Sequence, residues 1–251
     1  MSSVDRAANY LLRTMADDDF ARLEPSLMPM ELAKTEDLLA PDAPIRFTWF
    51  PVSGIVSVVA ETASGSQAEV AVVGREGMLS VSTLLGVDHE IMHIFCQMPC
   101  RAYQLPAMTM RALLDDSPTL RRHLLRYAQS FLLQTANSAL AYATQTIEVR
   151  LARWLVMSLD RLDNSEVAMT HEAFALMLGV RRPGVTVAIQ ALEARGAVIS
   201  RRGTIVVVDH SLLVDIAGDC YGVTEDAYRR VIGVALRRPR LTPYVDEAGA
   251  V

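Results

Sequence analysis

Five arginines and only two glutamates lie between residues 170 and 208 of this 251-residue chain. Arginine binds phosphate and pairs bidentately with guanine, glutamine pairs with adenine, and threonine or valine methyl groups pack on that of thymine. All of these residue types occur in this stretch. The candidate contact residues are Arg181, Arg182, Pro183, Thr186, Val187, Gln190, Arg201 and Arg202. Their chemistry is that of a surface that contacts the bases and phosphates of double-stranded DNA.

Two short helices around a tight turn are predicted to position these side chains. Thr170 suits the N-cap of the first helix, and Glu172 lies in its first turn, where a carboxylate interacts favourably with the helix dipole. Gly179 supplies the turn, because glycine accepts a positive φ. The second helix is predicted to bury apolar residues at i, i+4 and i+7, namely Val185, Ile189 and Leu192. The candidate residues at its N-terminal end then face outward, as in recognition helices.

A strand and an Arg-Arg-Gly turn follow the second helix. Gly203 allows a tight turn in the segment SRRGTIVV, so Arg201 and Arg202 are expected at the tip of a wing, against phosphates. An ordinary helical hairpin with a surface arginine pair is the alternative. The predicted strands and turn after the second helix favour a winged helix-turn-helix over that hairpin.

The formal net charge of −5 hides an uneven distribution. Residues 1–116 contain 8 Lys and Arg against 16 Asp and Glu, whereas residues 170–208 contain 5 Arg against 2 Glu, a local net charge of +3. The local surface is what meets phosphate, so the acidic total does not exclude nucleic-acid binding.

The pattern along the chain predicts an α+β protein. The first forty residues have helical spacing, and the segment from Ile45 to Tyr103 has short apolar runs separated by turn residues, as in a small antiparallel sandwich or jelly roll. The expected domains are a β-sandwich sensor at 1–116, a dimerisation helix at 117–145, a winged helix-turn-helix at 146–238 and a loose tail at 239–251.

The predicted long helix begins with Ser117 as N-cap and Pro118 at its first position. A helix of this length cannot bury every face within a small domain, so a second copy of the chain is its expected partner. The alternative is a helix packed wholly on its own sandwich. The residues expected in the dimer seam recur at spacings of three and four: Leu120, Leu124, Tyr127, Phe131, Gln134 and Ser138.

Several classes of protein are disfavoured by composition. With three cysteines, no apolar run long enough to span a bilayer and no signal-peptide pattern at Met1–Asp19, the chain is expected to be cytoplasmic and to have no membrane partner. It has no Walker-type loop, HExxH or GxSxG motif, so we do not expect an enzyme. A protein-interaction role for the basic turn is the alternative from another class, and steep salt dependence would distinguish DNA binding from it.

The order of β-domain, long helix and winged helix-turn-helix resembles the Crp/Fnr family of bacterial transcription regulators over roughly residues 10 to 235. The stretches FPVSGIVSVV, VGREGM and RLARWLVMSLDR, with MTH after them, are similar to one branch of that family. The resemblance implies a homodimer on a twofold-symmetric operator. Arg182 matches the family's guanine-reading arginine, but Pro183 stands for the usual glutamate and Val187 for a second arginine. The best-known family operator is therefore not expected in full.

The resemblance also implies a sensor domain, whose cyclic-nucleotide ligands are missing here. Gly77 of the Gly-Glu pair that holds ribose is present, but Met78 stands where the glutamate belongs, and no arginine for the phosphate occurs in the stretch VDHEIM. Burying the phosphate of a cyclic nucleotide without an arginine to pair with it would weaken the free energy of binding. We expect no tight binding of cyclic AMP or cyclic GMP and predict no cofactor; an unknown small-molecule effector is left open.

One cluster has residue types that bind metals or form thiol switches: His89, His93, Cys96 and Cys100. Neighbours alternate faces in a strand, and cysteine is commonly a small buried hydrophobe, so a structural role is the expected one. No cysteine precedes Cys96, so an N-terminal iron–sulfur cluster is not expected.

Overall fold

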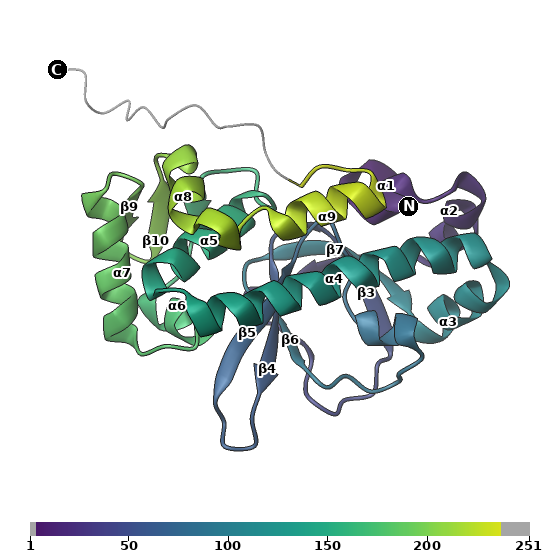
Figure 1. The fold of residues 1–251 in the computed structure, drawn as a ribbon. Coiled ribbons are helices and arrows are strands. Elements are labelled where there is room, and N and C mark those ends of the chain that lie inside the picture. Colours follow the sequence, from purple (N-terminus) through teal and green to yellow (C-terminus); the bar gives the residue numbers. More distant parts are fainter. Residues whose placement is uncertain (1–3, 237–251) are drawn as a thin grey trace.

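The computed structural model describes residues 4–236 and confirms the predicted α+β architecture. A β-sandwich and a helical domain with a small sheet are joined by one long helix, α4, which crosses the whole molecule (Figure 1). The predicted tail at 239–251 lies outside the described residues. In the described part of the chain, no helix has an apolar stretch long enough to cross a bilayer.

The N-terminal segment forms two short helices, α1 (Tyr10–Thr14) and α2 (Asp17–Leu23), flanked by 3-10 turns at Arg6–Ala8 and Glu24–Ser26. The Asn9 side chain accepts hydrogen bonds from the backbone N–H groups of Leu11 and Leu12 and so caps α1. Three aspartates occupy the first turn of α2, as their place before Phe20 predicts.

The sandwich consists of two antiparallel sheets. One has the order β1-β7-β3 and the other β2-β6-β4-β5. The bounds are β1 Met28–Leu32, β2 Asp37–Leu39, β3 Phe47–Ser53, β4 Val56–Glu61, β5 Gln67–Val73, β6 His93–Cys96 and β7 Cys100–Pro106, with a 3-10 turn at Val81–Leu85.

Strand β4 is buried on both faces. Val56 and Val58 belong to the core between the two sheets, whereas Val59 belongs to a core shared with the helical domain. A strand covered on both sides has no polar face, which explains why the stretch GIVSVV is apolar almost without interruption. The β-sandwich and the helical domain therefore share a hydrophobic cluster.

After α3 (Ala107–Asp116), helix α4 spans Pro118–Thr144, 27 residues. The Ser117 side chain accepts a hydrogen bond from Leu120 N and Pro118 takes the first position, as predicted. Helices α5 (Ile147–Leu159), α6 (His171–Met177), α7 (Arg182–Ala194) and α8 (His210–Ala217) then pack with a sheet of order β8-β10-β9, whose strands are Glu166–Val167, Thr204–Val207 and Val198–Arg201.

The expected dimer seam of α4 requires a correction. Leu120, Leu124 and Tyr127 are almost fully buried in a cluster with the N-terminal helices. Gln134 accepts a hydrogen bond from Val72 N, and the Ser138 hydroxyl accepts one from Arg153. Phe131 is half-buried against the same cores. A spacing of three and four marks a buried face whatever covers it, and here the chain's own domains cover these six residues.

The opposite side of α4 presents a different apolar stripe. Leu125, Leu132 and Leu140 are 40%, 51% and 58% exposed. Three exposed alanines lie on the same side of the helix. Ala136 and Ala139 lie between Leu132 and Leu140, and Ala143 lies beyond Leu140. We call these six residues the α4 stripe.

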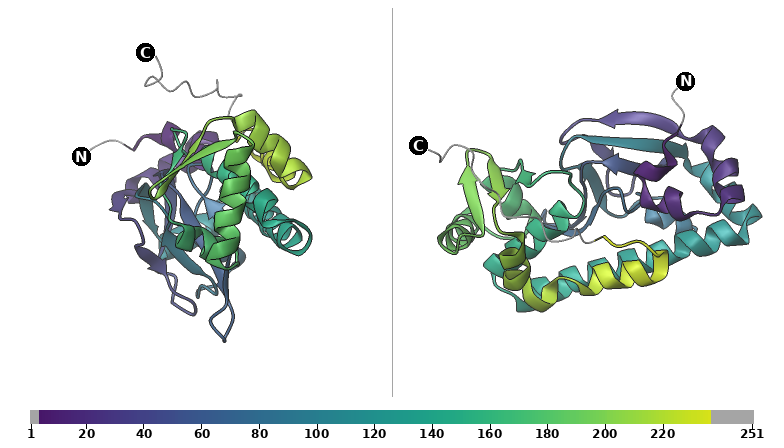
Figure 2. Two further views of the ribbon diagram at one scale, coloured as in Figure 1. Left: turned by 90° about the vertical axis from the view of Figure 1, so that its left-hand side faces the viewer. Right: turned by 90° about the horizontal axis from the view of Figure 1, so that it is seen from above.

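The last described helix, α9 (Val223–Ile232), follows a 3-10 turn at Gly218–Cys220 and returns to the sandwich domain. It runs side by side with α4 in two views (Figures 1 and 2). Tyr228 and Ile232 enter the N-terminal core, and the Tyr228 hydroxyl donates a hydrogen bond of 2.6 Å to the Glu76 carbonyl. Helix α9 thus ties the two domains together.

Candidate nucleic-acid interface

The local structure of the helix-turn-helix agrees with its sequence signals. The Thr170 hydroxyl accepts a hydrogen bond from Ala173 N, and Gly179 has a φ of +60° in the turn between α6 and α7. The inward face of α7 is almost fully buried, as predicted, and consists of Val185, Ile189 and Leu192. This burial fixes which face of α7 remains free.

The free face carries the predicted contact residues. Arg182 and Val187 have large exposed fractions, 64% for the side chain of Arg182 and 65% for Val187. Arg181, Pro183 and Gln190 are exposed and Thr186 is half-buried. Helix α7 lies at the edge of the molecule away from the sandwich (Figure 1). The structure therefore brings six of the eight candidates to one outward helix face.

The other two candidates, Arg201 and Arg202, lie at the turn between β9 and β10. The two strands pair with Arg201 opposite Thr204, and Gly203 has a φ of +74°. Both arginines and Gly203 are exposed. The predicted wing is therefore present, with two cations and a glycine turn at its tip.

Two residues that the sequence did not assign to the interface position its side chains. Glu172 of α6 forms an ion pair of 2.9 Å with Arg182, and His171 Nδ1 lies 3.0 Å from the Thr186 hydroxyl. Both side chains of the Arg182–Glu172 pair are exposed, so the pair contributes little to stability. Arg182 can therefore leave Glu172 at little cost. The sequence predicts Glu172 in the first turn of its helix, but the positions of Glu172 and Arg182 in the sequence do not indicate that their side chains form an ion pair.

A buried carboxylate links the helical domain to the β-sandwich. Glu69 of β5 accepts hydrogen bonds from Trp154 Nε1 on α5 and from the Ser57 hydroxyl on β4, each of 2.5 Å. Tyr142 of α4 donates to the backbone carbonyls of Glu69 and Met177. One side chain thus contacts the sandwich and the helical domain at the same point.

Burial raises the pKa of Glu69 from its ordinary 4.5 to about 7, against the opposing effect of the Ser57 and Trp154 hydrogen bonds. Because the folded-state pKa lies above the unfolded one, this group contributes stability that is complete below pH 4.5 and is lost as the pH rises through about 7. The loss amounts to about 3 kcal/mol.

Glu69→Gln is therefore expected to raise the free energy of unfolding at pH 8 by up to about 3 kcal/mol and to change it little at pH 4.5. Glutamine keeps an acceptor for Trp154 and a donor for Ser57. Denaturant unfolding of both proteins between pH 4 and 9 measures the difference. The exposed Glu61→Gln is the control; parallel pH profiles for wild type and Glu69→Gln would contradict the assignment.

Of the four residues considered as metal or thiol ligands, Cys96 and Cys100 are neighbours in the sandwich core, but the two histidines do not join them. His89 pairs with Asp88 on the surface, His93 Nε2 lies 2.7 Å from Asp37, and both Cys96 and Cys100 are buried in the sandwich. The hydrogen bond with the Cys96 side chain and, after it, burial raise the pKa of the Cys100 thiol, which disfavours a reactive thiolate. Over residues 4–236, no three such ligands are grouped to hold a metal ion.

Comparisons with known proteins agree with this geometry. Residues 149–216 match the model of the Crp-like helix-turn-helix domain. No curated protein matches the sequence. Among solved structures, a protein from Eubacterium rectale described as a Crp/Fnr-family transcriptional regulator is similar with a TM-score of 0.67 and 15% identity, covering 84% of this chain and 99% of that one.

Two further solved structures have the same fold. FixK2 from Bradyrhizobium japonicum has a TM-score of 0.64 at 16% identity, covering 76% of this chain and 96% of its own. CLP from Xanthomonas campestris, described as a global regulator responsive to c-di-GMP, has a TM-score of 0.63 at 17% identity, covering 76% of this chain and 99% of its own. The chain thus contains a Crp-like helix-turn-helix domain, and its overall fold is that of the solved Crp/Fnr-type structures.

Proposed function

We propose that the protein binds a palindromic DNA operator as a homodimer and regulates transcription there under the control of its sandwich domain. The observation that carries the proposal is the outward face of α7, where Arg182, Val187 and Gln190 are exposed above a buried helix-turn-helix core. Arginine and glutamine suit guanine and adenine, and the branched side chain suits a thymine methyl group. The wing arginines suit phosphates.

A homodimer is supported by the α4 stripe. Its three leucines leave apolar surface in water on an otherwise long and regular helix, and its alanines let a second helix approach closely. If two copies paired along this stripe, their two α7 helices could enter successive major grooves of DNA, which are about 34 Å apart. The twofold axis of the dimer then matches the twofold axis of a palindrome.

Control by the sandwich is supported by how the reader domain is held. Trp154 of α5 and Tyr142 of α4 both bond to Glu69 of the sensor, and α9 returns to the N-terminal core. A change in the sandwich therefore changes the support of α7. This corresponds to a population shift between binding-competent and incompetent states.

Salt dependence tests whether the surface binds DNA. Binding of the full chain to pooled genomic duplexes should weaken steeply between 50 and 200 mM salt, by roughly 10³-fold or more if a dimer contacts at least six phosphates. Arg201→Ala and Arg202→Ala should weaken binding to all sequences alike and reduce the slope by about 1 each per protomer. Fluorescence anisotropy measures both effects.

The control is Arg101→Ala, which removes an exposed arginine of the sensor domain from β7. It should leave the salt slope unchanged. If no genomic duplex binds at any salt concentration, the basic surface serves another partner, and the protein-interaction alternative replaces the proposal.

A further inference from the structure

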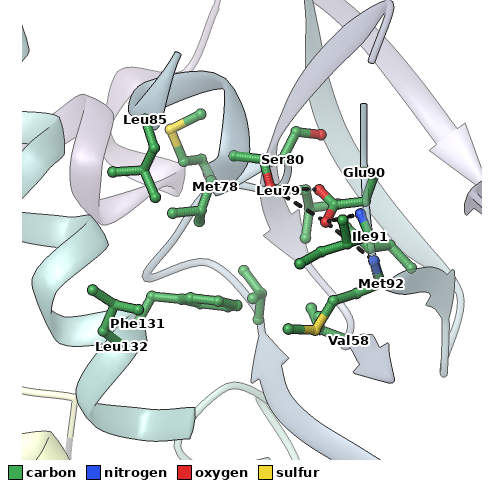
Figure 3. A pocket seen from close by; sticks show the side chains of 14 residues that line it. Val58, Met78, Leu79, Ser80, Leu85, Glu90, Ile91, Met92, Phe131 and Leu132 are labelled. Carbon is green, nitrogen blue, oxygen red and sulfur yellow. Dashed lines mark hydrogen bonds between the residues drawn. The ribbon is translucent and has the colours of Figure 1, made fainter. Parts of the chain in front are cut away.

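An apolar cavity of about 170 Å³ lies between the sandwich and α4 (Figure 3). Val58 of β4, Met78, Leu79 and Met92 form its walls, and Phe131 of α4 closes one side. An engineered protein cavity of roughly 150 Å³ holds benzene, so this volume suits a molecule with roughly six to ten non-hydrogen atoms.

The polar groups in this cavity lie on one side. Glu90 is 4% exposed, and its carboxylate accepts hydrogen bonds from Ile91 N, Met92 N and the Ser82 hydroxyl at 3.0 to 3.3 Å. In Figure 3 the Glu90 carboxylate lies among the apolar side chains that line the cavity. Oε1 accepts from all three donors, whereas Oε2 accepts only from Ser82, which it shares with Oε1, so Oε2 has capacity for one more donor.

The charge of the cavity is negative. Among the residues that line it in the described part of the chain, Glu90 is the one ionisable side chain, and no arginine, lysine or histidine is present. Burial of Glu90 raises its pKa, because the carboxylate has lost water without gaining a cation. An anionic ligand would lose its own hydration, meet this carboxylate and find no positive partner.

The mouth of the cavity is also apolar. Leu85, Ile91 and Leu132 are 55%, 70% and 51% exposed and surround the opening. Apolar side chains at a cavity mouth favour a ligand whose own apolar surface leaves water on binding. Leu132 belongs to the α4 stripe as well, so in the proposed homodimer the second copy covers this side of the opening, and Leu85 and Ile91 form the side that stays open. A ligand here contacts the helix that connects sensor and reader.

We propose that this cavity binds a small apolar molecule that carries a hydroxyl or amino donor and no negative charge, with the donor on Glu90. The inference deepens the proposed function and rests on it for its consequence, since such a ligand would act on DNA binding through Phe131 and Leu132 of α4. The binding itself does not depend on DNA.

A matched series of six-carbon probes tests the ligand class on the full chain: hexanol, hexylamine and hexanoate, with cyclic AMP as the nucleotide probe. Methyl resonances of carbon-13-labelled methionines report where each probe binds. Hexanol and hexylamine should shift Met78 and Met92, which line the cavity, and leave Met108, which is 80% exposed on α3, unchanged. Hexanoate should bind at least about tenfold more weakly, and cyclic AMP should shift none of the three.

Two variants separate the cavity from other apolar surface. Ile91→Trp at the mouth should block hexanol, whereas Val223→Trp, an exposed apolar position of α9, should not. Glu90→Gln should weaken hexylamine by roughly tenfold and hexanol much less, because only the amine carries a charge.

Hexanoate or cyclic AMP bound as tightly as hexanol would overturn the proposal. So would a titration to the solubility limit of hexanol that leaves Met78 and Met92 unshifted. Because this readout involves no DNA, its failure leaves the proposed DNA binding intact, and failure of DNA binding leaves the ligand result intact.

Discussion

Arg161→Met is expected to lower the free energy of unfolding by about 3 to 5 kcal/mol. Arg161 and Glu76 form an ion pair of 2.8 Å, with side chains only 2% and 4% exposed. The arginine also donates to the Met157 carbonyl, and Glu76 accepts from Gly74 N. Methionine has a similar length but no charge, so the substitution leaves the Glu76 carboxylate buried without a cation.

Thermal and denaturant unfolding measure this loss, which should lower the midpoint temperature by roughly 10 °C for a chain of this size. The matched control is Arg195→Met, because Arg195 pairs with Glu148 at 3.0 Å with side chains 49% and 29% exposed. An exposed pair contributes at most about 1 kcal/mol. If the two substitutions lowered the free energy of unfolding equally, the buried Arg161–Glu76 pair would stabilise the protein no more than an exposed pair does.

The second large effect is expected on the α4 stripe. Leu125→Glu combined with Leu140→Glu should convert a dimer into a folded monomer, because both side chains are exposed within one chain and are needed only between two. Loss of the second reader removes the gain from simultaneous binding to two half-sites, so operator affinity should fall by roughly 10²-fold or more.

Sedimentation at micromolar concentration measures the mass, and anisotropy measures the affinity. Met108→Glu, which charges an 80% exposed apolar residue of α3, is the control and should keep the dimer. A wild-type protein that is monomeric while it binds a palindrome, or a double variant that stays dimeric, would contradict the stripe as the interface.

Local sequence signals predicted the helices and their ends because a cap or a turn depends on nearby atoms. Ser117, Thr170, Gly179 and Gly203 all have the expected local conformation. The outward face of α7 could be predicted for the same reason: once the buried spacing is identified, the free face is its complement.

The partner of a buried face could not be predicted in this way. Leu120, Leu124 and Tyr127 have the spacing of a seam, but that spacing does not depend on whether the covering surface belongs to the same chain. The hydrogen bond between Glu69 and Trp154 joins residues 85 positions apart, and neither residue type in its local context indicates the other. Long-range contacts of this kind required the structure.

The motif VGREGM illustrates what the structure adds to a resemblance. A side chain at Gly77 would place its Cβ 2.2 Å from the Tyr127 hydroxyl, and one at Gly74 would lie 2.9 Å from Arg161. The two glycines therefore allow α4 and the segment just after α5 to approach the sandwich closely. Met78 is fully buried and lines the apolar cavity, where the Crp/Fnr resemblance implied a glutamate for ribose.

We propose that α7 reads DNA sequence through Arg182, and selection of bound genomic fragments by the wild-type protein in parallel with Arg182→Ala tests this role. We expect one palindromic motif for the wild type. For the variant we expect the same motif with relaxed preference at one symmetric base pair, at a cost of about 1 to 3 kcal/mol. An unchanged motif for Arg182→Ala, or no common motif for the wild type, would contradict it.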